Sequence, residues 1–439
     1  MDESVNIQDI KKSTLKKTMR RILPFILILY VVAFLDRVNM GYAALEMNAE
    51  LALSAEVFGF LSGIFYISYC LFEVPSNMIL HKVGAKLWIS RIMITWGIIV
   101  VLTGFVQSAT HLYILRFLLG VAEAGFTPGI ILYLTYWFRV RERGKATAAF
   151  FVALPLAALI GAPLSTWIID HIAWAGLSGW RWMFILEGLP AIVLGIVVLF
   201  YLTNRPTDAK WLTNEEKTWL EDELEKERKV AATHNKTSHL GMLKDSKVWK
   251  LAVFNIAGFV AVNGLNFWIP TIIKNLSVAG TSNMEVGWLA MIPSLIAIPS
   301  ILFVGWNADR TNKYKHHLAA CVSIAMIGLI GCAFVTSVPL MILTLSVTSA
   351  GLYGISGSFY AYLTYFFSES TAPAGIALVS TLSSLGGFIG PMILGILNLQ
   401  QGMLMIAGFM IISLLTLITL NHGPSKHGTI GVKEESNIL

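Results

Sequence analysis

The sequence predicts an all-α membrane protein that crosses the bilayer about twelve times, as two halves of six helices. Three observations support this expectation: 56% of the 439 residues are hydrophobic, only 13% are charged, and apolar runs long enough to span a bilayer recur along the chain. A soluble domain has roughly 25% charged residues. The chain therefore has too few to cover a water-soluble body of its size, and we expect lipid around most of it.

The first half, residues 23–203, is expected to begin with a retained span and not with a cleaved signal peptide. It follows a basic and polar segment at 1–22, and its first apolar run is interrupted by Asp36 and Arg37 and lacks a clear cleavage site. A span needs about 20 mainly apolar residues. Six such runs are found at 23–44, 56–80, 87–107, 111–137, 146–170 and 183–203.

The longest hydrophilic stretch, residues 204–247, separates the two halves. A possible capping box at 213–216 precedes a charged run, so we interpret this stretch as a cytoplasmic linker with a surface helix. Residues 248–421 should form the second half and residues 422–439 a cytoplasmic tail. The spans of the second half are expected at 249–273, 286–306, 317–336, 339–367, 374–398 and 403–420. Two joined halves of this kind are a recurrent transporter plan.

Lysine and arginine residues predict how the chain is oriented. They are concentrated in the N-terminal segment and in the loops after the second, fourth and eighth spans, whereas the loop at 45–55 has none. Loops rich in these residues stay on the cytoplasmic side. We therefore expect a multi-pass protein of the cell (inner or plasma) membrane with both termini in the cytoplasm. The net charge of +6 follows from these loops and does not suggest nucleic acid as a partner.

Ionisable residues inside the spans are few, and nearly all lie in the first half. Asp36 and Arg37 interrupt the first span, while Arg116 and Glu123 lie in the fourth, about two turns apart on one face. Such a side chain in the hydrocarbon core costs about 2.5–3.5 kcal/mol on insertion scales, so it usually has a function. The sequence therefore assigns the handling of charge to the first half. Glu187 in the sixth span is interpreted more simply, as a clasp with Arg181.

The four charged residues suggest that transport of a carboxylate is coupled to protons. If an arginine moved from a buried acid to a substrate carboxylate, the acid would bind a proton more readily, so substrate and proton would bind with mutual help. The alternative is that these residues are fixed ion pairs that hold the first and fourth helices together. Arg37 points about 100° away from Asp36, so packing against a neighbouring helix is a further alternative for Arg37.

Several motifs resemble those of the major facilitator superfamily and, within it, of the anion:cation symporter family. The loop after the eighth span reads Gly305-Trp-Asn-Ala-Asp309-Arg310, which is similar to the superfamily's Gly-xxx-Asp-Arg loop. The segments similar to the narrower family are FLDRVN at 34–39, EVPSN at 73–77, RFLLGVAEAG at 116–125, GWRWMF at 179–184 and PTDAKWL at 206–212. The resemblance covers nearly the whole chain, and the order and spacing of the segments make it specific.

The resemblance implies the superfamily fold, a monomer, and a substrate such as a sugar acid, a tartrate-like acid or an aromatic acid. It also implies that Asp36 and Glu123 are the protonation sites and that Arg116 and Arg37 lie near the anion. An arginine suits that role because its planar fork binds a carboxylate through two hydrogen bonds. For Gly305, Asp309 and Arg310 the resemblance implies a gating or structural role.

The chain departs from the family pattern at two places. In the first half, His81 stands where the gating loop usually has aspartate. In the eleventh span, Ser380 and Ser384 occupy positions where many relatives have asparagine, which favours a less hydroxylated substrate. The superfamily fold lines its cavity with the first, fourth, seventh and tenth helices. We therefore expect Asn266 and Tyr360 to contact substrate along with the two serines, with packing as the alternative for an aromatic side chain.

The expected function is thus proton-coupled uptake of a small organic anion by alternating access. The lipid bilayer is the expected partner, the proton is the expected coupling ion, and no cofactor or metal is expected. Sodium coupling, and exchange or export of the anion, are alternatives within transport. An enzyme is not expected, because the spans contain no set of nucleophile, base or metal ligands. A membrane sensor is a more remote alternative, because it would need a sizeable soluble domain and the longest hydrophilic stretch is 204–247.

Overall fold

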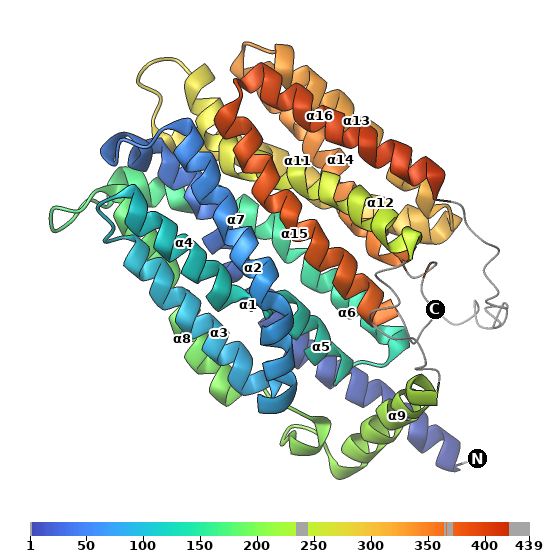
Figure 1. Ribbon diagram of the computed structural model, residues 1–439. Coiled ribbons are helices and arrows are strands. Elements are labelled where there is room, and N and C mark those ends of the chain that lie inside the picture. Colours follow the sequence, from blue (N-terminus) through green and yellow to red (C-terminus); the bar gives the residue numbers. More distant parts are fainter. Residues whose placement is uncertain (1, 234–244, 364–365, 367–371, 421–439) are drawn as a thin grey trace.

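The computed structural model describes residues 2–233, 245–363, 366 and 372–420, and these parts of the chain fold into helices joined by short connections (Figure 1). Among the described residues, twelve helices are long and apolar enough to cross a membrane. This confirms the predicted all-α class. The predicted tail at 422–439 and residues 234–244 of the linker lie outside the described residues.

The first half contributes six of these spans. They are α1 (Asp2–Glu50), α2 (Ala55–Val83), α3 (Ala85–Thr103), α4 continued by α5 (Ala109–Glu123 and Phe126–Thr135), α7 (Ala153–His171) and α8 (Gly179–Tyr201). A short helix, α6 (Val140–Phe151), leads into α7. The first helix is much longer than the predicted span 23–44, because its polar residues from Asp2 onward also form helix.

The second half contributes the other six spans. They are α11 (Ser246–Leu276), α12 (Asn283–Thr311), α13 (Tyr314–Phe334), α14 (Val338–Leu363), α15 (Ala372–Ile396) and α16 (Leu399–Thr419). Between the halves lie a short 3-10 helix, Pro206–Asp208, and the surface helix α9 (Asn214–Thr233). The predicted capping box is present, since Glu216 N donates to Thr213 Oγ1 over 3.2 Å and Thr213 N donates to Glu216 Oε2 over 2.9 Å.

The two halves meet along three helix pairs, α2 with α15, α7 with α12 and α1 with α11 (Figure 1). We call the end of the bundle that carries α9 the linker end, and the opposite end, which carries Glu50 and Asn283, the far end. Close approach near the far end depends on small residues. A Cβ added to Gly287 of α12 would lie 2.7 Å from Ala162 O of α7, and one added to Gly41 of α1 would lie 2.9 Å from Phe267 O of α11.

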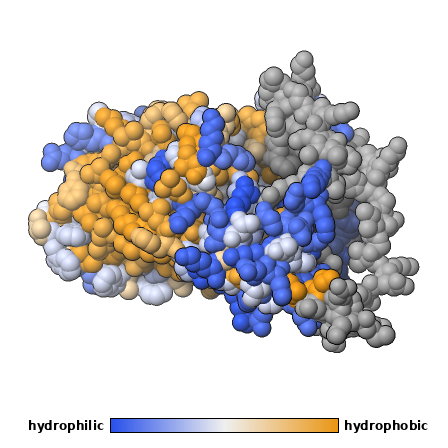
Figure 2. Space-filling view, turned by 90° about the horizontal axis from the view of Figure 1, so that it is seen from below, coloured by the Kyte–Doolittle hydropathy of each residue, from blue (hydrophilic) through white to orange (hydrophobic). Residues whose placement is uncertain are grey.

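The surface of the bundle fits a lipid environment. Figure 2 shows a continuous hydrophobic patch over one side of the visible face and hydrophilic residues gathered on the other. Large apolar side chains such as Val193 of α8 and Ile327 of α13 are exposed in the middle of long helices. Such exposure would be costly in water and is expected in a bilayer.

The linker helix α9 is fastened to the first half by charged side chains. Lys17 Nζ of α1 donates to Glu216 over 2.8 Å, and Ser13 Oγ donates to the same carboxylate over 2.6 Å. Further along α9, Arg139 Nη1 lies 3.0 Å from Glu223 Oε2. Burial on its own would raise the pKa of Glu216, but the hydrogen bonds that it accepts outweigh burial and hold this pKa below its usual value.

We expect this attachment to weaken in acid. Because the folded-state pKa of Glu216 is lowered, its contribution is complete at neutral pH, starts to fall near the ordinary glutamate pKa of about 4.3 and is lost at lower pH. Spin labels on α1 and α9 should report separation of the helices in Glu216→Gln at neutral pH and in the wild type only in acid. Glu215→Gln is the control, since Glu215 is exposed. An α1–α9 distance in Glu216→Gln that matches the wild type would contradict this prediction.

Candidate functional site

Helices α1 and α4 bring two of the predicted charges together in a buried ion pair. Arg37 Nε donates to Glu123 Oε1 over 2.6 Å, and Arg37 Nη2 lies 2.5 Å from the same oxygen. The Glu123 side chain is 2% exposed and the Arg37 side chain 14%. Arg37 thus packs against a neighbouring helix through an ion pair, and its expected contact with the anion stays a prediction. The charge centre predicted between the first and fourth spans is present, with Arg37 as the partner of the carboxylate.

The chain breaks its fourth span directly after Glu123. Helix α4 ends at this residue and α5 begins at Phe126, with Gly125 between them in the left-handed region at φ 86°. The sequence predicted one continuous span over 111–137. A carboxylate at the C-terminal end of a helix is opposed by the helix dipole. The Arg37 guanidinium therefore offsets an unfavourable position as well as burial.

Replacing Gly125 by alanine should destabilise the protein and disturb this site. A left-handed residue with a side chain costs about 1–2 kcal/mol, and a Cβ here would also lie 2.8 Å from Ser76 Cβ on α2. Thermal unfolding in detergent should show a lower melting temperature. Gly258→Ala is the matched control, because a Cβ at Gly258 meets nothing within 4 Å. Equal melting temperatures for the two variants would contradict the prediction.

Arg116 lies about two turns before Glu123 on α4. It has no carboxylate partner in the described part of the chain. Its side chain is buried at 2% exposure, and its Nε donates weakly to Leu61 O over 3.5 Å. Its guanidinium lies 5.6 Å from the ring centre of Phe65 on α2 and 5.9 Å from that of Phe267 on α11. A buried guanidinium without a counter-charge is costly, and this arrangement suits the binding of an anion.

Aromatic rings of α2 connect the two arginines. The Arg37 guanidinium lies 5.5 Å from the ring centre of Phe65 and 5.3 Å from that of Tyr69. Phe65 thus contacts both cations. The hydroxyl of the next residue, Tyr66, donates to Asn263 Oδ1 of α11, which links the halves at this level. No motif in the sequence marked these α2 residues, although their spacing at 65, 66 and 69 places Phe65 and Tyr66 within one turn of Tyr69.

Asp36 is separate from the arginine pair. Its Oδ2 accepts a hydrogen bond from Trp96 Nε1 of α3 over 2.9 Å, and its Oδ1 is buried without a hydrogen-bond partner. The sequence suggested a single cluster of two carboxylates and two arginines. The structure does not contain such a cluster among the described residues, because Asp36 contacts Trp96 and not the arginines. The reason is the step of about 100° between adjacent helix residues, which directs Arg37 toward α4 and Asp36 toward α3.

The predicted contacts of the second half fall into two groups. Asn266 of α11 lies beside Tyr353 of α14, and Asn266 Nδ2 and the Tyr353 hydroxyl are both buried without a hydrogen-bond partner. Asn266 also precedes Phe267, the ring beside Arg116. Tyr360 of α14 lies instead beside Ser380 and stacks on Phe151 of the first half, with ring centres 5.3 Å apart and planes 10° apart.

Two more predicted residues are engaged locally. Ser384 Oγ donates to Ser380 O within α15 over 3.4 Å. At the linker end of α12, Asp309 accepts from the Tyr314 hydroxyl over 2.7 Å, and the guanidinium of Arg310 lies 5.4 Å from the ring centre of Trp306. Gly305 lies one turn before them in the same helix. Their predicted gating role stays a prediction.

Glu73 has a larger part in the structure than its position near a span end suggests. It is buried on α2, and its Oε2 accepts a hydrogen bond from Thr381 Oγ1 of α15 over 2.7 Å. The bond joins the two halves near Ser380. Its signal in the sequence was weak, since a glutamate near a span end can also extend its charge to the membrane surface.

The predicted clasp between Glu187 and Arg181 is wrong. Arg181 Nη2 pairs with Glu50 Oε1 of α1 over 2.9 Å and also donates to backbone carbonyl groups at the end of α3. Glu187 lies deeper in α8, where its Oε1 accepts from Ser165 Oγ of α7 over 2.6 Å. Glu187 follows Arg181 by six positions, which places them on different turns and about 120° apart around the helix.

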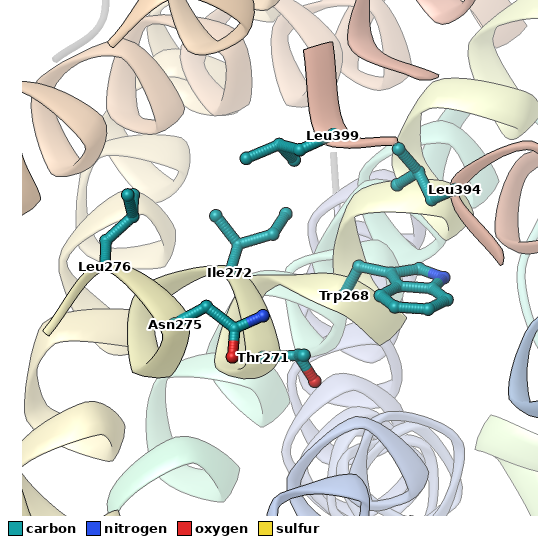
Figure 3. A pocket seen from close by; sticks show the side chains of 7 residues that line it. All are labelled: Trp268, Thr271, Ile272, Asn275, Leu276, Leu394 and Leu399. Atoms are coloured by element: carbon teal, nitrogen blue, oxygen red, sulfur yellow. The ribbon is translucent and has the colours of Figure 1, made fainter. Parts of the chain in front are cut away.

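A cavity of about 270 Å³ lies between α11, α15 and α16 (Figure 3). Its lining is mostly apolar, with Thr271 and Asn275 as polar members. Figure 3 shows that Trp268 borders it from α11. None of the described residues that line this cavity is charged, so we place the candidate anion site at Arg116 and the Arg37–Glu123 pair.

Comparisons with known proteins agree with this fold. A sequence model of the Major Facilitator Superfamily matches residues 26–315 and 276–437. The chain is 42% identical over 429 residues to a "Putative tartrate transporter" of Agrobacterium vitis, covering 96% of this chain and 95% of that one. It is 35% identical to a quinolone resistance transporter of Acinetobacter baumannii, with 94% of each chain covered.

A solved structure shares the fold. The crystal structure of a bacterial homologue of the human lysosomal transporter Spinster, in an inward-facing and occupied conformation, superposes with a TM-score of 0.73. The superposition covers 90% of this chain and 95% of that one at 15% sequence identity. At this identity the likeness concerns the fold alone.

Proposed function

The chain belongs to the major facilitator superfamily, and we propose that it is a secondary transporter that takes up a small organic anion together with protons. The observation that supports this most directly is the buried Arg116 guanidinium, which has no carboxylate partner among the described residues and lies on the same helix as Glu123 of the buried Arg37–Glu123 ion pair. One arginine is available to an anion, and the other can be shared with it. The similarity to a tartrate transporter favours a carboxylate as the anion.

The proposed coupling follows from competition for Arg37. A substrate carboxylate that binds Arg116 would lie beside Phe65, the ring that also contacts Arg37. When the anion also attracts Arg37, Glu123 loses its only ion-pair partner among the described residues. A buried carboxylate without a partner is costly, so it takes up a proton. Anion and proton then bind with mutual help, which is the condition for symport.

Alternating access would open and close the two ends of the bundle in turn. Near the far end, Asp170 of α7 accepts from the backbone N–H of Met284 in α12 over 2.7 Å, and Glu46 of α1 accepts from Asn283 Nδ2 over 3.1 Å. We propose that these bonds close the outer side and that the linker end faces the cytoplasm. Uptake would require them to separate while the contacts near Glu73 hold.

The test is uptake of labelled carboxylates by proteoliposomes. An imposed inward proton gradient should drive accumulation of at least one sugar acid, tartrate-like acid or aromatic acid, and a protonophore should abolish that accumulation. Dependence on a sodium gradient would keep the anion site and overturn the proton role. Absence of uptake of every carboxylate by folded, reconstituted protein would refute the proposal.

Export or exchange is the second candidate, and the similarity to a quinolone resistance transporter favours it. An exporter that uses the same buried charges would expel its substrate in exchange for protons that enter down an inward gradient. Vesicles preloaded with labelled substrate distinguish the two directions. Proton-driven efflux of a quinolone without uptake of any carboxylate would favour this candidate.

A further inference from the structure

A second cavity, of about 390 Å³, lies between α1, α7 and α8, and none of the described residues that line it belongs to the arginine site. Its walls are mainly apolar side chains, among them Leu35 of α1, Leu164 and Trp167 of α7, and Leu186 and Pro190 of α8. Leu164 is 40% exposed and Trp167 is 43% exposed, so both lie at the outer surface of the bundle. In a bilayer this surface contacts lipid. The cavity is therefore a groove that opens toward the hydrocarbon region.

One ionisable side chain lies in this apolar lining. Glu187 of α8 lines the groove although it is only 3% exposed. Its Oε1 accepts a hydrogen bond from Ser165 Oγ over 2.6 Å, whereas its Oε2 is buried without a hydrogen-bond partner. Asn39 of α1 adjoins this carboxyl, yet the amide nitrogen of Asn39 is also without a partner. Among the described residues, Glu187 forms no ion pair with lysine or arginine. Buried polar atoms nearly always have a partner, so the free oxygen points to a ligand.

The lining sets three requirements for that ligand. A buried carboxylate without a counter-charge is costly, so the ligand should be a cation. The free oxygen of Glu187 accepts hydrogen bonds, so the cation should carry an N–H donor. The apolar walls bind an apolar body. A protonated amine on a hydrophobic body meets all three requirements, and an indole ring such as that of Trp167 also attracts an ammonium group.

Other occupants fit the groove less well. A metal ion such as Ca²⁺ takes six to eight oxygen ligands, whereas Glu187 is the only described lining residue with a side-chain oxygen. A lipid acyl chain would fill the apolar walls but would leave Glu187 Oε2 without a donor. A carboxylate would face Glu187 without a basic residue in the described lining to bind it.

The depth of the groove suits entry from the membrane. Glu187 lies eight residues after the start of α8 at the far end, which is about 12 Å along the helix axis. Trp167 lies four residues before the end of α7 at the same end of the bundle, which is about 6 Å along the axis. The groove thus lies in the leaflet nearer the far end. Amphiphilic amines gather at the membrane surface, so a short movement would bring the ammonium group to Glu187.

We propose that the groove between α1, α7 and α8 is a second ligand site, which takes up from the bilayer an organic cation made of a protonated amine and an apolar body. Glu187 binds the ammonium group, and Ser165 positions the carboxyl. This site is opposite in charge to the anion site at Arg116. The inference goes beyond the proposed function and does not depend on it, because the test below measures binding and not transport.

Photolabelling of the full-length protein in proteoliposomes tests the site. The probe is para-benzoyl-benzylamine, a primary amine whose benzophenone group cross-links to nearby C–H bonds under light. The alcohol and the carboxylic acid with the same benzophenone body are the control probes. Mass spectrometry of the peptides should place saturable labelling by the amine on the segments of α1, α7 or α8 that line the groove. Labelling there by the alcohol or the acid should be much weaker.

Glu187→Gln should reduce labelling by the amine at low probe concentration roughly tenfold, which is the expected effect of losing a hydrogen bond between charged groups. Glu73→Gln is the matched control. It makes the same substitution at a buried glutamate that does not line the groove, and it should be labelled as the wild type is. Equal labelling of Glu187→Gln and the wild type would overturn the proposal. So would labelling by the alcohol or the acid as strong as that by the amine, or labelling by the amine that does not saturate.

A second variant decides the matter should Glu187→Gln not fold. In Leu164→Trp a larger ring would fill the mouth of the groove, so saturable labelling by the amine should be lost. Leu118→Trp is its control, because Leu118 of α4 is 43% exposed and lies outside the groove, and this variant should be labelled as the wild type is. Labelling of Leu164→Trp at the wild-type level would overturn the proposal, and so would labelling of the wild type only outside the groove.

Discussion

Replacing Glu123 by glutamine is expected to abolish proton-driven accumulation of the anion while leaving counterflow intact. Glutamine keeps the size of the side chain and can still accept a hydrogen bond from Arg37, but it cannot take up a proton. For each coupled proton, an inward gradient of about one pH unit allows the wild type to concentrate the anion about tenfold. The variant should reach equal concentrations on both sides.

The measurement is uptake into proteoliposomes with and without an imposed pH gradient, together with counterflow against preloaded unlabelled anion. We expect Asp36→Asn to behave in the same way, because the resemblance to the anion:cation symporter family makes Asp36 the other protonation site. Glu56→Gln should accumulate as the wild type does, because its side chain is exposed. Full accumulation in Glu123→Gln and in Asp36→Asn would remove both residues from the coupling mechanism.

Replacing Arg116 by lysine is expected to weaken anion binding strongly. A hydrogen bond to a charged group contributes about 1.5–3 kcal/mol, so loss of one bond of the arginine fork should raise the apparent KM roughly 10- to 100-fold. The fold should tolerate the change, because Arg116 has no carboxylate partner that the substitution would leave unpaired in the described chain. Arg37→Lys is different, since it would disturb Glu123.

The apparent affinity for the anion can be taken from concentration-dependent uptake and from binding to purified protein. Arg91→Lys is the matched control. Arg91 lies in α3 with its guanidinium 3.8 Å from the ring centre of Trp88, and its replacement should leave the affinity unchanged. An affinity of Arg116→Lys equal to that of the wild type would exclude Arg116 from the anion site.

The sequence by itself determined the membrane class, the twelve spans, the two halves and the location of the buried charge. These follow from composition and periodicity, because lipid tolerates only long apolar helices and leaves few ionisable residues inside them. The capping box at 213–216 was also predictable, since it depends only on residues in the same turn. The limits of the spans were harder to predict from the sequence. The first helix continues through polar residues, and the left-handed Gly125 could not be told from glycines that merely pack between helices.

The pairing of the charges was decided by tertiary structure. Arg116 and Glu123 lie on one face of the fourth span, but at 1.5 Å per residue they are about 10 Å apart along it, so neither can neutralise the other closely. Which helix supplies the missing partner depends on how α1 is rotated against α4, and no local pattern encodes that rotation. The same packing turns Asp36 toward Trp96 and Glu187 toward Ser165, and it pairs Arg181 with Glu50. The sequence shows which ionisable groups lie inside the spans, whereas the fold decides which of them pair with one another.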